Sequence, residues 1–384
     1  MTRDLGRIFL GRDLQCAQCH DHPNIEAYLQ RHYHGLSAFL NRSYLFTDPK
    51  SKQASIGEKA DGAVKFTSGF TSESGETAPR LLDLPPIEDP PPVKEPYTVK
   101  PDKKARSVPV YSRRLQLAVA MTDPANVAFR RNIANRLWAL MMGRGIVEPL
   151  DMWHSENPPS HPALLDLLAD ALAEHDYDMR FLLRELALTK TYQRSSQYKA
   201  GFENVSDSHC AVALLKPLSP EQLAWSMMQA TSLIKTTLED LKAKHLKAGA
   251  ENAAVDVADP LWQEEALHDA LKGHVDTFAG LFGVAGIQTS RFDASANQAL
   301  FLRNGTVLQN WLAPSDNGLT AHLKTLKPPQ LVDEFYLSVF SRPPTAEEAE
   351  QVTLFLKQNQ DHLETAIGQL VWAALSSAEF RFNH

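Results

Sequence analysis

The chain has 384 residues, of which 43% are hydrophobic and 22% charged, and its formal net charge at neutral pH is -7. These proportions are typical of a globular protein and exclude a disordered or fibrous chain, and the length suits two unequal domains. Basic residues are spread along the chain and no apolar run approaches the roughly 20 residues of a membrane-spanning helix, so we expect neither a nucleic-acid partner nor an integral membrane protein.

Residues 1–48 are predicted to form two short helices on either side of a cysteine turn. The first begins near the N-terminus, where apolar side chains recur at helical spacing, and the pattern ends before Pro23. The second is expected from about Ile25 through Phe39. The cysteine turn should therefore lie between two helices.

The turn carries Cys16 and Cys19 followed by His20, a C-x-x-C-H motif. In c-type cytochromes, two thiols at this spacing add to the haem vinyl groups and the adjacent imidazole ligates the iron. The sequence therefore predicts Cys16, Cys19 and His20 as cofactor-binding residues, with His20 as the metal ligand. The chain has only three cysteines, too few for a disulfide scaffold, and Cys210 has no evident partner.

Two alternatives to haem stay open in this segment, which also contains His22, His32 and His34. The two cysteines and two imidazoles could complete a tetrahedral zinc shell. The thiols could also be small buried groups that bind nothing. For His32 and His34 the simplest expectation is a solvated helix face.

Residues 49–110 are predicted to form a Pro-rich connector. Val64–Phe70 alternates loosely among Gly, Ser and Thr neighbours, which indicates a short strand pair or an irregular flap. Prolines are dense from Pro79 to Pro109, which favours an extended course and excludes a helix. We expect a strap packed along the following domain rather than a recognition sequence for a proline-binding module.

Residues 111–384 are predicted to form a helical domain, because apolar residues recur there at helical spacing almost without interruption. One helix should begin at Asp123 and Pro124 and end at Gly143, and another should begin at Ser160. The fold class predicted for the whole chain is therefore mainly α, with a short cytochrome-like helical segment at the N-terminus and a partly β connecting strap.

Further along the chain, capping boxes predict helix starts at Ser219 and Thr345. Lys242–Asp259 lacks a clear period, so we expect a flexible excursion there. In the helix that should end at Gly143, Asn135 and Arg136 are expected to satisfy a local hydrogen-bond network rather than to form a site.

The polar loop 148–159 holds further candidates. Met152 and His154 could supply a second axial ligand to a haem iron, although a methionine more often covers a core and a histidine more often faces water. Asp151 and Glu156 could act as acid and base in a hydrolase of a surface polymer. An exposed acidic loop is the ordinary explanation for the two carboxylates.

The N-terminal segment resembles the C-terminal half of a planctomycete cytochrome-like domain of unknown function (family 1549). The rest resembles its usual C-terminal partner, another domain of unknown function (family 1553). The stretches that carry the resemblance are Phe9–Pro23, Tyr33–Phe39, Asn132–Trp138, Gly143–Val147, Pro158–Pro162, Gln298–Gly305, Ser341–Thr345 and Ser376–Phe380. Cys16, Cys19 and His20 fall on the family's C-x-x-C-H, and His22 and Pro23 fall on the H-P that follows it.

The resemblance implies an exported protein of a biochemically uncharacterised family. Together with the C-x-x-C-H motif, it leads us to expect a protein in the periplasm or at the cell surface that carries haem c and transfers electrons. It leaves enzyme activity undecided and the redox partner unknown. Because haem attachment is normally extracytoplasmic and no signal peptide is visible, we expect a segment upstream of Met1. The alternatives are a structural or interaction protein with a zinc clip or a buried thiol pair, and then a hydrolase acting on surface polysaccharide.

Overall fold

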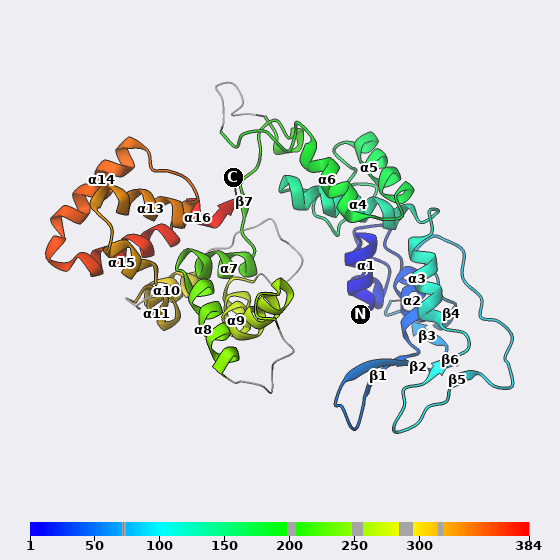
Figure 1. Ribbon diagram of the computed structural model, residues 1–384. Coiled ribbons are helices and arrows are strands. Elements are labelled where there is room, and N and C mark those ends of the chain that lie inside the picture. The colour runs from blue at the N-terminus through cyan, green and yellow to red at the C-terminus, as the bar shows by residue number, and fades with distance from the viewer. Residues whose placement is uncertain are drawn as a thin grey trace. The chain divides into compact units, whose positions relative to one another are not determined.

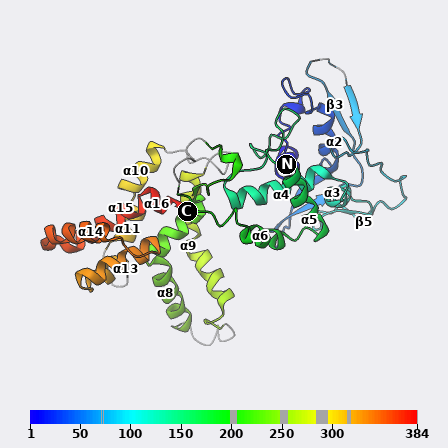
Figure 2. The same ribbon diagram turned by 90° about the horizontal axis from the view of Figure 1, so that it is seen from above.

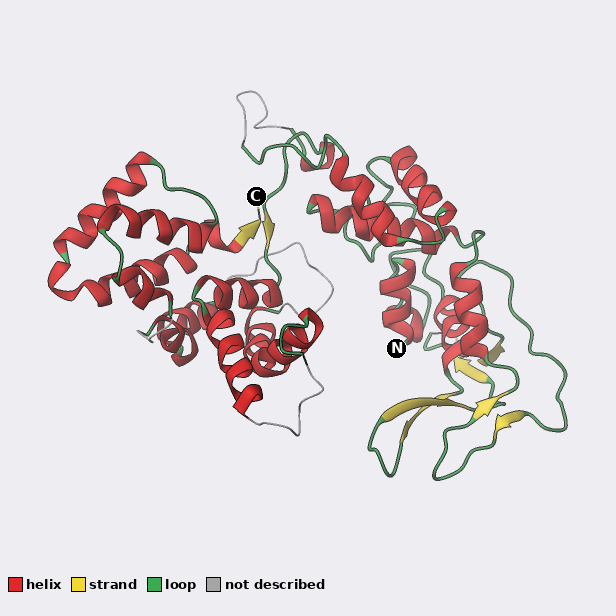
Figure 3. Ribbon diagram, viewed as in Figure 1, coloured by secondary structure: helices red, strands yellow, loops and turns green. Residues whose placement is uncertain are grey.

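The computed structural model describes residues 1–70, 72, 74–197, 205–247, 256–283, 295–313 and 318–383. Helices dominate these residues, and their strands form only two-stranded sheets (Figure 3), so the predicted mainly α fold is confirmed. The chain divides into two compact units, Met1–Leu214 and Leu215–His384. This boundary falls inside the predicted helical domain, and the segment limits at residues 48 and 110 stay a prediction.

The first unit combines helices with three small sheets (Figure 1). Its helices are α1 (Thr2–Leu10), α2 (Gln30–Leu40), α3 (Arg113–Thr122), α4 (Val127–Met142), α5 (Pro162–Glu174) and α6 (Met179–Leu188), with 3-10 turns η1 (Cys16–Gln18) and η2 (Asp207–His209). Its antiparallel strand pairs are β1 (Ser43–Thr47) with β2 (Ala54–Glu58), β3 (Val64–Thr67) with β4 (Ser74–Thr77), and β5 (Tyr97–Val99) with β6 (Val108–Pro109). The strand pair expected near Val64–Phe70 is therefore confirmed.

The Pro-rich strap packs against the helices, as expected. Residues 79–109, all within the described part of the chain, contain no helix. Leu81 and Leu82 of the strap are buried in one cluster with Leu117 of α3. The Asp89 carboxylate accepts hydrogen bonds from the Arg113 guanidinium at 2.8 and 3.0 Å. A buried apolar contact and an ion pair thus fix the strap to the first turns of α3.

Two predicted helix starts are wrong, and in each case a side chain accepts hydrogen bonds from backbone N–H groups near the start of the helix. The helix expected from Ile25 begins at Gln30, since the backbone N–H groups of Asn24 and Ile25 donate to Nδ1 of His22, both at 3.1 Å. The helix expected at Asp123 begins at Val127, because the Asn126 side chain accepts from Phe129 N at 3.2 Å and is the N-cap.

Two further boundaries also differ from the prediction. The helix expected at Ser160 begins at Pro162, because both the backbone N–H and the hydroxyl of Ser160 donate to Ile146 O. The segment expected to be a flexible excursion from Lys242 is helical as far as Lys247, and residues 248–255 lie outside the described residues. The end of α4 at Gly143 is confirmed, with a φ of 85° at this glycine.

Side chains of α4 fix α1 in place. The amide of Asn132 donates to Ile8 O at 2.7 Å, and the guanidinium of Arg136 donates to Arg7 O at 2.6 Å. These are carbonyls of the last turn of α1, which have no partner inside the helix. Gly11 then ends α1 with a φ of 65°, and a Cβ there would lie 2.7 Å from Oδ1 of Asn132. Close packing on α4 therefore favours glycine at this position.

The loop after α4 pairs with the chain that leads into the cysteine turn. The backbone N–H of Asp13 donates to Asp151 O at 2.9 Å, and that of Trp153 donates to Gly11 O at 3.1 Å. Asn135 of α4 holds the start of this loop, because its amide donates to Val147 O at 2.9 Å and accepts from Val147 N at 3.0 Å. The hydrogen-bond network predicted for Asn135 and its neighbour Arg136 is confirmed.

The second unit has its own apolar core. Its helices are α7 (Pro220–Ala230), α8 (Leu233–Lys247), α9 (Pro260–Phe282), α10 (Ala296–Asn304), α11 (Thr306–Leu312), α12 (Leu319–Lys324), α13 (Pro328–Phe340), α14 (Ala346–Gln358), α15 (Leu363–Leu375) and α16 (Ala378–Arg381), with a 3-10 turn η4 (Gln360–His362). Helices α8 and α9 lie side by side (Figures 1 and 2). A short strand pair joins the two ends of this unit, β7 (Lys216–Pro217) with β8 (Phe382–Asn383). The capping boxes predicted at Ser219 and Thr345 are both present.

Arg342 links three helices of the second unit. Its guanidinium donates to Glu348 of α14 at 2.8 and 2.9 Å and to Glu379 of α16 at 2.6 and 3.0 Å, and it lies over the Tyr336 ring of α13. The hydrogen bonds from Arg342 lower the pKa of Glu348 to about 2. Among the described helices of the chain, none is long and apolar enough to cross a membrane.

We expect Asn135→Ala to lower the free energy of unfolding of the first unit by about 2 to 4 kcal/mol, because two buried backbone groups of Val147 lose their partner. Hydrogen exchange of α4 amides in increasing urea measures this change. Asn24→Ala is the matched control, since that residue is exposed, and it should change stability by less than about 0.5 kcal/mol. Equal free energies of unfolding for the two variants would contradict the role assigned to Asn135.

Candidate functional site

The C-x-x-C-H motif forms a single tight turn. The backbone N–H groups of Cys19 and His20 both donate to Cys16 O, at 3.2 and 3.4 Å. Leu14 and Ala17 are fully buried below the turn, whereas Cys16 and Cys19 are exposed and free. The turn thus has a buried side that anchors it and an exposed side that carries both thiols. The exposure of both cysteines contradicts the buried thiol pair considered above.

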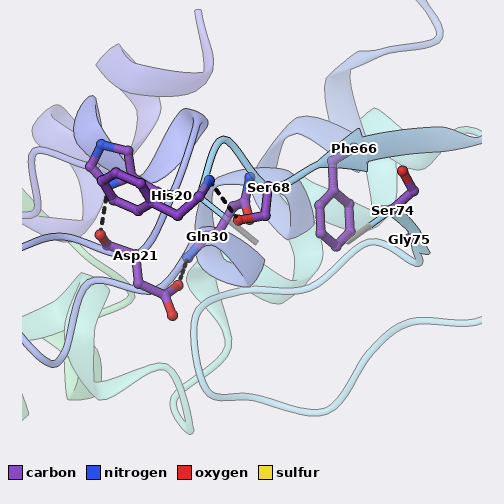
Figure 4. Close-up of a pocket in the computed structure, with 8 residues that line it drawn as sticks. His20, Asp21, Gln30, Phe66, Ser68, Ser74 and Gly75 are labelled. Atoms are coloured by element: carbon purple, nitrogen blue, oxygen red, sulfur yellow. Dashed lines mark hydrogen bonds between the residues drawn. The ribbon is translucent and has the colours of Figure 1, made fainter. Parts of the chain in front are cut away.

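The His20 ring is fixed by a hydrogen bond to the backbone. Its Nδ1 lies 2.7 Å from Asp21 O (Figure 4). A carbonyl oxygen only accepts, so Nδ1 must carry the proton, and Nε2 keeps its lone pair while the ring is neutral. Metal-bound histidines almost always donate their other ring N–H in this way. This arrangement would suit His20 to bind a metal ion through Nε2.

Two of the neighbouring histidines have the opposite tautomer. Nδ1 of His22 accepts from two backbone N–H groups at 3.1 Å, and Nδ1 of His32 accepts from Leu29 N at 3.4 Å. In a neutral ring this places the proton on Nε2, and Nε2 of His32 donates to Asp83 at 2.9 Å. Neither ring presents a free Nε2 lone pair to a metal ion.

The solvated helix face expected for His32 and His34 is wrong. His32 is 1% exposed, and burial lowers its pKa. His34 is half-buried, its Nε2 donates to Gln18 O at 3.0 Å, and burial lowers its pKa as well. His34 therefore links α2 to the cysteine turn, whereas His32 links α2 to Asp83 of the strap.

The zinc alternative concerns the two cysteines of the turn and the nearby histidines. A structural zinc site takes four ligands, usually Cys and His. Within the residues that the structure describes, no group of three or more His, Cys, Asp or Glu side chains is close enough to hold a metal ion.

A cavity of about 550 Å³ opens beside His20. It is lined by His20, Asp21, Gln30, Phe66, Ser68, Phe70, Ser74 and Gly75 (Figure 4). Its volume is in the range of small-molecule and cofactor sites, roughly 300 to 1,000 Å³. Apart from His20, none of these residues was predicted as a site residue. Their positions depend on the β3–β4 hairpin packing against the cysteine turn, for which the sequence has no local signal.

The loop residues proposed as a second axial ligand lie near the chain that leads into the turn. Met152 forms an isolated β-bridge with Arg12, four residues before Cys16. The His154 ring contacts the Tyr28 ring edge-on at 6.2 Å. In the described residues, Nδ1 of His154 is buried and has no hydrogen-bond partner. The structure thus places the loop beside the N-terminal segment but selects neither side chain.

The carboxylates considered for a hydrolase are not arranged as an evident pair. Asp151 is 14% exposed and accepts a hydrogen bond from Nε of Arg7 at 2.7 Å. Glu156 is exposed in the same loop. Asp151 therefore serves to fix α1 to the loop, and the structure adds no geometry that favours acid and base catalysis.

The comparisons with known proteins identify the family. A family model described as "Protein of unknown function (DUF1553)" matches residues 113–356, which is more than half of the chain. The chain belongs to this family. The match begins at the first residue of α3 and ends within α14, so the cysteine turn lies outside it. The comparisons with curated proteins and with solved structures found no match.

Family membership therefore leaves the function of the turn open. The resemblance of the N-terminal segment to a cytochrome-like domain stays a prediction, because the family match does not reach it. Within the matched part, Asn132, Asn135 and Arg136 hold the N-terminal segment and the loop after α4 in place. In this chain, helix α4 of the matched region thus holds the segment that leads into the turn.

Cys16 and Cys19 should react with iodoacetamide in the native protein before Cys210 does. Both are exposed, whereas Cys210 is half-buried and burial raises its pKa, so less of it is thiolate at a given pH. Peptide mass spectrometry after timed alkylation measures the three rates. In urea the difference should shrink, and faster alkylation of Cys210 in the native protein would contradict the placement of the turn.

Proposed function

We propose that this protein is an extracytoplasmic c-type haem protein that transfers electrons. The observation that carries the proposal is the His20 imidazole, whose Nδ1 lies 2.7 Å from a backbone carbonyl and whose Nε2 is thereby left as a ligand. Two exposed, free thiols on the same turn accompany it. This is the donor set that covalent haem attachment requires.

Each residue of the turn has a separate role in the proposal. Cys16 and Cys19 would tether the porphyrin through thioether bonds, and His20 would bind the iron through Nε2. The haem iron, when bound, supplies one-electron redox chemistry. The hydrogen bond from Nδ1 orients the ring and increases its basicity. Met152 and His154 would be the candidates for a second iron ligand.

The location and partner follow from the chemistry of attachment. Covalent haem attachment is normally extracytoplasmic, so the proposed location is the periplasm or the cell surface. The partner would be another redox protein that exchanges electrons with the haem. This chain has a formal net charge of -7, so a positively charged docking face on the partner would speed association.

The decisive experiment is expression of the full chain behind an export signal, together with a haem-attachment system. We expect a red protein whose haem stays attached after denaturation, because thioether bonds survive unfolding. Cys16→Ser combined with Cys19→Ser should abolish the covalent haem band. Cys210→Ser is the matched control and should keep it, since this cysteine lies outside the turn.

Two outcomes would overturn the proposal. One is a folded but colourless protein with both thiols free. The other is a colourless protein that contains one equivalent of zinc by elemental analysis, which would favour an interaction protein with a metal clip. Normal circular dichroism of the exported protein shows that a colourless result does not come from misfolding.

A further inference from the structure

The β3–β4 hairpin is fixed to the cysteine turn by hydrogen bonds. The backbone N–H of Gly69, at the hairpin tip, donates to Cys19 O at 2.7 Å. A Cβ at Gly69 would lie 3.2 Å from the same oxygen, which is tighter than most such contacts. The hairpin therefore approaches the turn closely at a residue without a side chain.

Gln30, the first residue of α2, bonds to both the cysteine turn and the hairpin. Its side chain is 7% exposed. Its amide nitrogen donates to Gln18 O of the cysteine turn at 3.5 Å and to Thr67 O of β3 at 3.4 Å. Its backbone N–H donates to the Asp21 carboxylate at 2.6 Å. A buried amide thus connects the turn, the hairpin and the start of α2 beside the cavity.

Two hairpin phenylalanines lie against the histidines of the site. The Phe70 and His20 ring centroids are 4.3 Å apart, and those of Phe66 and His34 are 4.7 Å apart with the rings nearly parallel. Phe66 packs across Gly75 of β4, where a Cβ would lie 3.0 Å from its ring. Both phenylalanines also line the cavity, and Figure 4 shows Phe66. Aromatic rings are thus set at the wall of the cavity that faces the motif.

The polar groups of the cavity lie around these rings. Asp21, Ser68 and Ser74 line it together with Gln30. Phe70 is 75% exposed, so a flat ligand laid against it would remove apolar surface from water. Hydroxyl and amide groups could then meet polar substituents at the edge of such a ligand.

We infer that the β3–β4 hairpin supplies the noncovalent half of a tetrapyrrole site, in which Phe70 and Phe66 contact the face of the ring system beside His20. The inference rests on the proposed function for the identity of the ligand. It goes beyond that proposal because it assigns binding to residues outside the C-x-x-C-H motif. It also explains why the connector hairpin is fixed to the cysteine turn.

The test uses the full-length protein without haem and metal-free mesoporphyrin as the probe. This porphyrin has ethyl groups in place of vinyl groups and has no iron, so neither thioether bonds nor ligation by His20 can contribute. Fluorescence titration gives its Kd. We expect Phe70→Ala and Phe66→Ala each to raise the Kd by about 3- to 10-fold, as expected for loss of one aromatic contact.

Two controls accompany the titration. Leu45→Ala removes another exposed apolar side chain, 73% exposed on β1 and outside the cavity lining, and should leave the Kd unchanged. Phe70→Tyr should restore binding, since it keeps the ring.

The outcomes separate this inference from the proposed function. No porphyrin binding, or equal Kd values for Phe70→Ala and Leu45→Ala, would overturn the inference. If Phe66→Ala unfolds the hairpin, the comparison of Phe70→Ala with Leu45→Ala still tests the inference. Hairpin-dependent porphyrin binding in a protein that stays colourless after export would overturn covalent haem attachment but leave the inference standing.

Discussion

The structure of the N-terminal segment depends on hydrogen bonds from α4 side chains to the last carbonyls of α1. Asn132 and Arg136 satisfy two acceptors that a helix end leaves without partners. Gly11 then turns the chain so that Arg12 and Asp13 pair with the loop after α4. These bonds, together with the burial of Leu14 and Ala17, fix the chain that leads into the cysteine turn to the helical unit.

Backbone hydrogen bonds also decide which ring nitrogen of each histidine carries the proton. A carbonyl near Nδ1 of His20 fixes the proton there, whereas backbone N–H groups near Nδ1 of His22 and His32 fix it on Nε2. Three rings of the same residue type, within 13 positions of one another, therefore differ in which nitrogen can bind a metal ion. The difference favours a site with one imidazole ligand over a clip that needs two.

Much of the fold could be predicted from local signals in the sequence. The capping boxes at Ser219 and Thr345 and the glycine stop at Gly143 involve residues within one turn of each other, so their pattern survives in the sequence. The C-x-x-C-H turn is local in the same sense. Asn126 was missed because the neighbouring Asp123 and Pro124 have the same local signature.

The rest of the site depends on contacts between distant positions. The buried His32 bonds to Asp83, 51 residues away. Gln30, which lines the cavity, bonds to Thr67, 37 residues away. Phe70 becomes a site residue only because the hairpin tip lies on Cys19. Helical periodicity describes none of these contacts. The predicted solvated face for His32 and His34 was therefore wrong, and Phe66 and Phe70 were not predicted to line a cavity.

The tautomer of His20 in the haem-free protein tests the central claim most directly. Long-range proton–nitrogen correlation spectra of protein labelled with ¹⁵N-histidine, recorded near about pH 8 where an ordinary imidazole is neutral, distinguish the two ring nitrogens. We expect His20 to be protonated on Nδ1 and His22 on Nε2. A His20 ring protonated on Nε2 would contradict the account, because it would have no nitrogen directed to a ligand in the way proposed.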